Sequence, residues 1–252
     1  MITVSQLHKR YGGRAVLRGV DAEFPVGGVT SLIGPNGAGK STLLMAMARL
    51  LEPSSGEIRL QGRGVGGIPI AEYALRVATL RQSPGFNMRL TVEELVAFGR
   101  FPHSRGAMTA EDHRAVDDAI DFLSLRELRH AYVDEISGGQ RQMAFLAMTV
   151  AQQTDVLLLD EPLNNLDMKH AVQIMRALRR LCDEHGRTVI LVIHDINFAA
   201  NYSDHIVALK DGALRFSGPA TEVVTEERLR DLYEIDFEIT RSASGCICNY
   251  FL

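Results

Sequence analysis

The sequence has no hydrophobic run long enough to cross a membrane. Residues 156–159 and 189–193 are continuous apolar stretches, but a spanning helix needs about 20 such residues. Residues 1–13 also lack the basic and apolar regions of a signal peptide. We therefore expect a soluble chain that stays in the cytoplasm.

Basic charge is not in excess either. The chain has 27 Lys and Arg against 31 Asp and Glu, which gives a net charge of −4 at pH 7. A protein whose main partner is nucleic acid carries positive charge concentrated on one face or in one domain. We therefore expect no nucleic acid among the partners of this chain.

Cysteine is scarce as well. The three cysteines are Cys182, Cys246 and Cys248, an odd number that fits no metal-site spacing. A disulfide framework or a zinc site is disfavoured, and free thiols in a reducing compartment are expected instead. Cys246 and Cys248 are expected to lie in a strand near the C-terminus.

A glycine-rich stretch at residues 34–42 is the first feature that indicates a specific chemistry. It reads Gly-Pro-Asn-Gly-Ala-Gly-Lys-Ser-Thr and fits the pattern G-x-x-x-x-G-K-[ST] of phosphate-binding loops. A buried strand is expected over residues 29–33, and apolar residues at helical spacing follow the stretch. Glycines let the backbone approach a polyphosphate, and a helix N-terminus adds partial positive charge. We call residues 34–42 the phosphate cradle.

The phosphate cradle predicts a nucleotide ligand with bound Mg²⁺. Lys40 is expected to hold the β- and γ-phosphates, and Ser41 is expected to bind Mg²⁺. The alternative is a glycine-rich turn that precedes a core helix and binds nothing. The candidates for phosphate contact are Gly34, Asn36, Gly37, Gly39, Lys40, Ser41 and Thr42.

A pair of carboxylates after a second buried strand indicates hydrolysis. Asp160 and Glu161 follow the apolar residues 156–159. In phosphate-loop proteins an aspartate on a neighbouring strand holds Mg²⁺, which is the role that we expect for Asp160. Glu161 is expected to act as the general base on the attacking water, a role that contributes roughly 10²- to 10⁴-fold in rate. The alternative is a solvated acidic strand end.

The pattern of expected elements favours an α/β fold. Buried strands at residues 29–33, 156–159 and 189–193 are typical of a parallel sheet. Residues 2–7 are expected to form an edge strand, and residues 57–60 a short strand that also flanks the phosphate cradle. Residues 83–153 have the periodicity of consecutive helices.

The four residues Ser137-Gly138-Gly139-Gln140 open one of these helices, just ahead of the acidic strand. Alone, they indicate no more than a helix cap that needs no ligand. In this order along the chain, however, the sequence resembles the nucleotide-binding subunits of the ATP-binding cassette (ABC) transporters, whose signature is usually written LSGGQ. Ile136 stands at the position of the leucine. The resemblance covers residues 1–220.

The resemblance implies a role for several residues that spacing does not assign. Ser137, Gly138, Gly139 and Gln140 would complete the ATP site of the opposite subunit, so that two chains enclose two nucleotides. Tyr11 would stack on adenine with Val16 beside it, although a lone tyrosine is otherwise a core or surface residue.

Three further positions match the family one by one. Gln82 would contact Mg²⁺ or water and link the site to a membrane subunit. His194 would touch the γ-phosphate and the catalytic water, although a histidine at a strand end is otherwise more often structural. Asp167 would belong to the loop that contacts the second subunit. Residues 163–165 depart from the usual family sequence, which leaves the hydrogen bonds between subunits open. The catalytic candidates are Glu161, His194, Lys40 and Gln82, and the metal ligands are Ser41, Gln82 and Asp160.

The fold implied by the resemblance is a P-loop NTPase (RecA-like) core with flanking antiparallel β-strands and an inserted α-helical subdomain. Residues 1–252 would form one ABC ATPase domain. Within it, residues 1–82 and 154–220 would form the nucleotide-binding core and residues 83–153 the helical subdomain. Residues 221–252 would be a C-terminal extension, in which we find no chemical motif.

Within the family, residues 99–103, 163–172 and 194–199 resemble importers of iron-siderophore complexes. The chain would then be an ATPase that works as a homodimer beneath two membrane-spanning permease subunits, at the cytoplasmic side of the membrane. A substrate-binding protein would be an indirect partner. The permease is expected to dock on residues 83–153, near Phe86, Met88 and Arg100.

Other functions remain as alternatives. A haem or cobalamin importer would share these features, because the ATPase never touches the cargo. A non-transport ABC ATPase would usually carry two cassettes or a coiled-coil insertion, and an exporter often has a fused membrane domain. A phosphate-loop kinase or GTPase would make the Ser137 motif an accidental helix cap.

Overall fold

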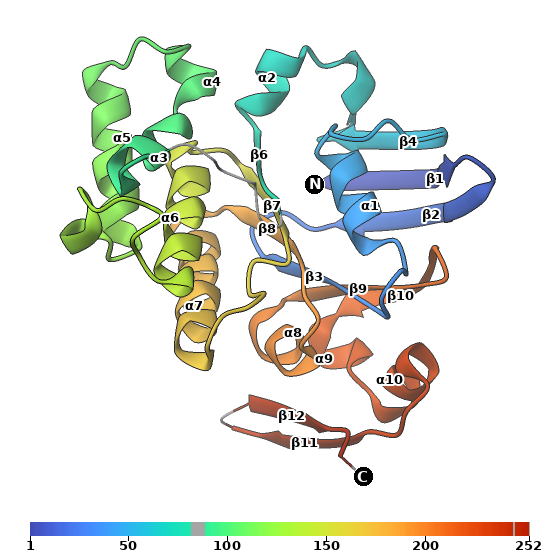
Figure 1. Ribbon diagram of the computed structural model, residues 1–252. Coiled ribbons are helices and arrows are strands. Elements are labelled where there is room, and N and C mark those ends of the chain that lie inside the picture. The colour runs from blue at the N-terminus through green and yellow to red at the C-terminus, as the bar shows by residue number, and fades with distance from the viewer. Residues whose placement is uncertain (82–88, 244, 252) are drawn as a thin grey trace.

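The computed structural model describes residues 1–81, 89–243 and 245–251. Two sheets and the helices that cover them form the body of the molecule, and a two-stranded hairpin lies at the C-terminal end (Figure 1). The expected P-loop NTPase fold, with flanking antiparallel strands and a helical insertion, is confirmed.

The first sheet is antiparallel and has four strands in the order β2-β1-β4-β5. Its strands are β1 (Ile2–Tyr11), β2 (Arg14–Phe24), β4 (Ser55–Leu60) and β5 (Arg63–Gly64). Ile2, Val4 and Leu7 of β1 are buried. The expectation of an edge strand at residues 2–7 is wrong, because β1 pairs with β2 on one side and with β4 on the other.

The second sheet has six strands in the order β10-β9-β3-β8-β7-β6. Its bounds are β3 (Val29–Ile33), β6 (Val77–Leu80), β7 (Val156–Asp160), β8 (Thr188–Val192), β9 (His205–Lys210) and β10 (Ala213–Pro219). All pairs are parallel except β9 with β10. Every residue of β3, β7 and β8 is buried, as expected for parallel strands that are covered on both faces.

Alternate residues of these strands enter two different hydrophobic cores. Leu158 and Ile190 pack with α1 (Lys40–Met47) and the first sheet. Leu157 and Leu191 pack on the other face, with the remaining long helices. These are α3 (Val92–Phe98), α5 (Ala110–Phe122), α6 (Gly138–Ala151), α7 (Met168–His185), α8 (Ile196–Tyr202) and α10 (Glu226–Tyr233), and the short ones are α2 (Ile70–Ala74), α4 (Phe101–Ser104) and α9 (Ala220–Val223). Among the described helices, none has the length and apolar character that crossing a membrane requires.

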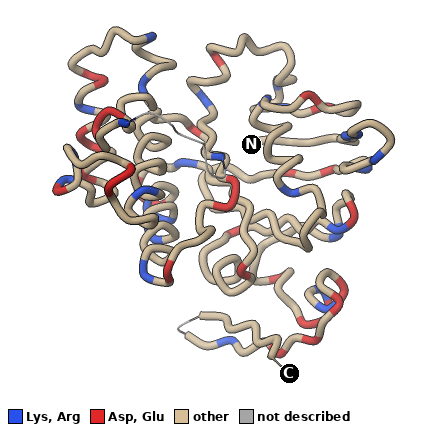
Figure 2. The backbone as a smooth tube through the Cα atoms, in the orientation of Figure 1, with Lys and Arg blue, Asp and Glu red and all other residues tan. Residues whose placement is uncertain are grey.

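Helices α3 and α5, between β6 and β7, each begin with a capping box. Thr91 and Glu94 form the box at the start of α3, and Thr109 with Asp112 forms the one at the start of α5. Arg residues are interspersed with Asp and Glu along this part of the chain (Figure 2). Arg129, for example, pairs with both Glu93 and Asp117.

Arg100, one of the residues near which the permease is expected to dock, is itself buried and cannot be part of an exposed surface. Its side chain is 2% exposed, and its Nε donates to Asp112 Oδ1 over 2.8 Å. A second nitrogen donates to the carbonyl oxygen of Ala151 at the end of α6. Hydrogen bonds from Thr109 and Arg100 hold the pKa of Asp112 well below its usual range. Arg100 therefore ties three helices together inside the fold. Phe86 and Met88 lie outside the described residues.

The C-terminal hairpin consists of β11 (Glu238–Ser242) and β12 (Gly245–Asn249), and it is held to α8 by two asparagines. Asn201 accepts from the N–H of Cys246 at 2.8 Å and donates to its carbonyl at 2.6 Å. Asn197 makes the same pair of bonds with Cys248, at 2.7 and 3.3 Å. The side chains of α8 thus take the place of a third strand along the edge of β12. All three cysteines are free thiols.

We expect Asn197→Ala with Asn201→Ala to lower the free energy of unfolding by about 2–6 kcal/mol, because the hydrogen bonds to both cysteines are lost and each contributes roughly 0.5–1.5 kcal/mol. Urea unfolding of the double variant measures this difference. Gln173→Ala, at an exposed position of α7, is the control and should stay within about 0.5 kcal/mol of the wild type. An unchanged unfolding midpoint in the double variant would show that the asparagines do not anchor the hairpin.

Candidate functional site

The phosphate cradle joins the end of β3 to the first turn of α1. Gly34 has φ 138°, and a Cβ there would clash with the carbonyl oxygen of Leu209 in the neighbouring strand β9. Gly39 has φ 98°, and its Cβ would lie 2.8 Å from a methyl carbon of Leu17. Both positions therefore require glycine, through backbone conformation and through close approach. The loop is shaped by the strands on each side of it.

Lys40 lies inside the phosphate cradle. Its Nζ donates to the carbonyl oxygens of Gly34 at 2.7 Å and Pro35 at 3.0 Å, and the side chain is buried. Burial lowers the pKa of Lys40, while the carboxylates of Glu161 and Asp160 act in the opposite direction. The ammonium group is thus partly desolvated and faces the loop, which strengthens its attraction for a phosphate.

Ser41 and Asp160 meet at the edge of the phosphate cradle. Ser41 Oγ donates to Asp160 Oδ1 over 2.8 Å. Burial raises the pKa of Asp160, and the hydrogen bond from Ser41 partly offsets this shift. Hydroxyl and carboxylate oxygens are the hard ligands that Mg²⁺ prefers, so these two residues fit that metal together with nucleotide phosphates. Their contact places a residue of α1 against the end of β7.

Glu161 and His194 are brought together at the ends of neighbouring strands β7 and β8. Nε2 of His194 lies 2.7 Å from Oε1 of Glu161, and the amide of Asn164 donates to the other carboxylate oxygen. Glu161 has φ 51°, the left-handed region that a residue with a side chain rarely adopts. Such local strain is found at functional positions, where the surrounding structure imposes it.

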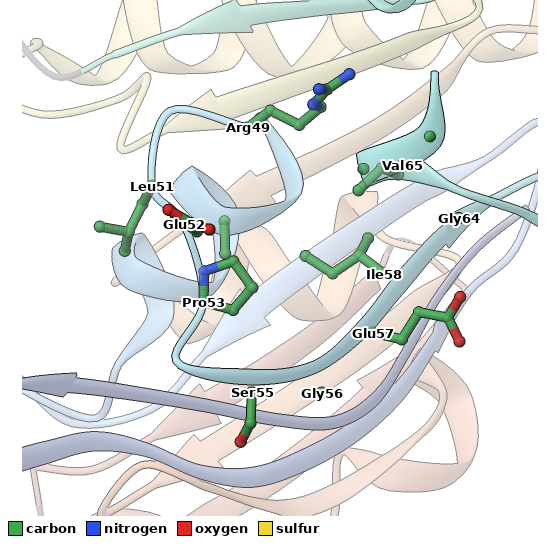
Figure 3. A pocket seen from close by; sticks show the side chains of 13 residues that line it. Arg49, Leu51, Glu52, Pro53, Ser55, Gly56, Glu57, Ile58, Gly64 and Val65 are labelled. Carbon is green, nitrogen blue, oxygen red and sulfur yellow. The ribbon is translucent and has the colours of Figure 1, made fainter. Parts of the chain in front are cut away.

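One cavity collects half of the predicted site residues. It measures about 170 Å³, and its lining comprises Val16, residues 36–42, Glu161 and His194. A larger cavity of about 660 Å³ lies elsewhere, between the end of α1 and strand β4 (Figure 3). Arg49, Glu52 and Glu57 line this larger cavity, and none of the predicted site residues does. The chemistry is therefore gathered in the smaller, more open hollow.

The residues expected from the ABC signature lie on the other side of the sheet. Ser137 and Gln140 form a capping box at the N-terminus of α6, with Gln140 N–H to Ser137 Oγ at 3.2 Å. Helix α6 packs in one hydrophobic core and α1 in the other. Gly138 and Gly139 are the first residues of α6, and Asp167 is the N-cap of α7. Lys40 and Ser137 thus belong to opposite faces of the six-stranded sheet (Figure 1).

Tyr11 does not line the smaller cavity. Tyr11 is 48% exposed at the end of β1, where the Lys9 ammonium lies 5.2 Å from its ring centroid. Gln82 lies outside the described residues, so its expected roles stay predictions.

Asn164 was not identified from the sequence. Its position in the segment that departs from the family pattern gave no reason to select it, yet it holds the carboxylate of Glu161. The signal that could have found it is the spacing: an asparagine three residues after an acidic strand end can turn its side-chain amide back to that carboxylate. The backbone makes the same turn, since the N–H of Asn164 donates to the carbonyl oxygen of Glu161 at 3.2 Å.

Known proteins share both the sequence and the fold. Residues 17–164 match the ABC transporter family. The chain is 46% identical over 251 residues to the petrobactin import ATP-binding protein YclP of Bacillus subtilis (strain 168), covering 100% of both proteins. It is 39% identical over 230 residues to the ferric enterobactin transport ATP-binding protein FepC of Escherichia coli (strain K12), covering 90% of this chain and 85% of that protein.

A solved structure agrees with these relatives. It is a dimeric ATP-binding cassette in a post-hydrolysis state bound to ADP and phosphate, with a TM-score of 0.77 and 28% identity. The superposition covers 87% of this chain and 99% of that one. The fold, the arrangement of residues around the phosphate cradle and full-length relatives agree, and the chain belongs to the ABC transporter family as one of its ATPases.

Proposed function

We propose that this chain hydrolyses ATP to drive the import of iron-siderophore complexes. The observation that carries the ATPase mechanism is the group formed by Glu161, His194 and Asn164 beside the phosphate cradle. The cargo class is supported by the relatives, which are named for the import of petrobactin and of ferric enterobactin. Import of haem or cobalamin is the alternative cargo.

The residues divide the work of hydrolysis. The cradle amides and Lys40 bind the β- and γ-phosphates, and Ser41 with Asp160 would hold Mg²⁺, which supplies charge neutralisation on the phosphates when bound. Glu161 takes a proton from the attacking water. His194 and Asn164 donate to the two oxygens of this carboxylate and so fix its direction. Tyr11 is proposed to stack on the adenine of ATP, with Val16 beside it. Gln82 is proposed to contact Mg²⁺ or water.

The proposal includes a homodimer with shared ATP sites. Ser137, Gly138, Gly139 and Gln140 begin a helix on the sheet face opposite to the phosphate cradle. A helix N-terminus attracts anions, so this turn can bind a γ-phosphate that is supplied by a second chain. Asp167 is proposed to contact that second chain. The dimeric cassette with bound ADP and phosphate supports such an arrangement.

The chain is proposed to consist of three parts and to work at the inner face of the membrane. Residues 1–82 and 154–220 would form the nucleotide-binding core, residues 83–153 the helical subdomain and residues 221–252 an extension. The dimer would lie at the cytoplasmic side of the membrane, beneath two permease subunits that receive cargo from a substrate-binding protein. Support comes from the relatives, which are import ATP-binding proteins.

A surface for the permease is proposed at the end of the molecule where α2 and α4 lie (Figure 1). Ile70 of α2 and Phe101 of α4 are exposed by 63% and 62%, and Phe98 at the end of α3 is also exposed. Large apolar side chains that gather on one end of a soluble domain are typical of an interaction surface.

Glu161→Gln should lower kcat by roughly 10²- to 10⁴-fold and leave ATP affinity unchanged, because the amide fills the same space but takes up no proton. Lys40→Ala should weaken ATP binding roughly tenfold or more, since it removes a charged hydrogen-bond donor. Steady-state hydrolysis and equilibrium ATP binding measure the two effects. Wild-type turnover in Glu161→Gln would exclude this residue as the general base.

Mixing a Lys40→Ala chain with a Ser137→Arg chain should restore activity that neither chain has alone. In the mixed dimer one site carries both lesions and the other carries none. With random pairing, half of the dimers are mixed and each has one intact site, so partial activity of up to about a quarter of the wild-type rate is expected. Crosslinking verifies that mixed dimers form. A mixture that contains them and stays inactive would contradict a shared ATP site that can work beside an inactive one.

Phe101→Ala should reduce cargo uptake in cells strongly while the purified subunit keeps its ATPase rate, because the side chain is proposed to contact the permease. Ile247→Ala is the matched control: Ile247 is 64% exposed in β12, at the opposite end of the molecule (Figure 1). Transport and ATPase assays on both variants provide the comparison. Equal loss of uptake in the two variants would show that α4 does not carry the docking surface.

A further inference from the structure

His170 lies between two segments that the proposed function assigns to different ATP sites. Asp167 Oδ1 accepts a hydrogen bond from the N–H of His170 at 2.9 Å and lies 2.8 Å from its ring nitrogen Nδ1. Because an ionised carboxylate only accepts, Nδ1 carries the proton and donates it. These two bonds lower the pKa of Asp167. The ring is therefore fixed in both direction and tautomer by the residue that caps α7.

The same ring also packs on Gly139. A Cβ at Gly139 would lie 2.4 Å from Cγ of His170 and 2.6 Å from both Cδ2 and Nδ1. A Cβ at the preceding Gly138 would meet no described atom within 4 Å. Gly139 is helical, so its backbone conformation does not require glycine. The requirement comes from the histidine ring, which occupies the space where a side chain would be.

This contact connects two functional segments within one chain. Gly139 begins α6 in the turn that is proposed to bind the nucleotide held by the partner chain. Asp167 ends the segment of residues 161–167, which starts at Glu161 and carries Asn164. A shift of the first turn of α6 would press on the ring of His170, and the ring is bound to Asp167.

We propose that His170 is a positioning residue that couples the two ATP sites of the dimer, by passing a movement of Gly139 to Asp167 and on to Glu161 in the same chain. The proposal rests on the proposed function, since only a shared-site dimer places Gly139 and Glu161 at different nucleotides. Phosphate binding at one site then adjusts the general base at the other.

The first test separates the hydrogen bond from the bulk of the side chain. Asn keeps a donor at the position of Nδ1, whereas Leu fills the space without one. We expect His170→Leu to lower kcat about tenfold, within the range of measured coupling energies, and His170→Asn to keep at least half of the wild-type kcat. The Kd for ATP should stay within twofold in both variants, because the phosphate cradle is on the other face of the sheet.

Three results would overturn the coupling: equal loss of kcat in both variants, loss of ATP affinity in parallel with kcat, or no loss in His170→Leu. A purely structural role of His170 would lower the thermal unfolding midpoint without this split between kcat and Kd. A wild-type chain that does not hydrolyse ATP would instead overturn the proposed function, so the two failures are distinguishable.

The second test uses the contact itself. Gly139→Ala should lower both kcat and the unfolding midpoint, because the new methyl group displaces the ring. Adding His170→Ala removes the overlapping atoms and should recover the unfolding midpoint, whereas kcat should stay about tenfold below the wild type because the donor to Asp167 is also lost. Recovery of the midpoint and of kcat together would show that His170 passes nothing on to Asp167, and no recovery of the midpoint would show that Gly139 does not act through His170. Both results overturn the proposal.

Discussion

The site depends on the register of three parallel strands. Leu32 of β3 pairs with Val192 of β8, and Val192 pairs with Asp160 of β7, so the three strands end at the same level. The chain segments that follow them carry the phosphate cradle, His194 and Glu161. A slip of one residue in any strand would move these groups apart and would also turn buried side chains to the wrong core. The apolar faces that stabilise the sheet therefore also set the positions of the catalytic atoms.

Sequence reasoning succeeded where a pattern is local. The loop of residues 34–42 between a strand and a helix and the carboxylates at the end of a buried strand each depend on residues within a few positions, and the expected β-strands were found for the same reason. The errors concern partners far along the chain. Strand β1 has an alternating pattern on one face, but its second neighbour, β4, is fixed by pairing with residues 55–60.

Arg100 and Asn164 are two further residues whose partners could not be identified from the sequence. The burial of Arg100 was not predicted, because nothing nearby in the sequence indicates that Asp112 and the end of α6 will enclose it. Asn164 looked like a departure from a pattern, although it contacts the carboxylate of Glu161. Tyr11 could be selected only by resemblance to the family, since its expected contact is with the bound nucleotide and not with another residue of the chain. Burial and partners are properties of the folded chain, and a single sequence reports them only indirectly.

The attachment of α8 to the C-terminal hairpin has a consequence for folding during synthesis on the ribosome. The partners of Asn201 and Asn197 are Cys246 and Cys248, which follow them by 45 and 51 residues. At the usual speed of synthesis, roughly 5–20 residues per second, each cysteine is synthesised about 2–10 s after the asparagine that it binds. Gly212, whose N–H donates to the Ala38 carbonyl of the phosphate cradle, is synthesised before either cysteine. The nascent chain thus holds this contact of the phosphate cradle in hand before the helix next to His194 can be attached to the hairpin.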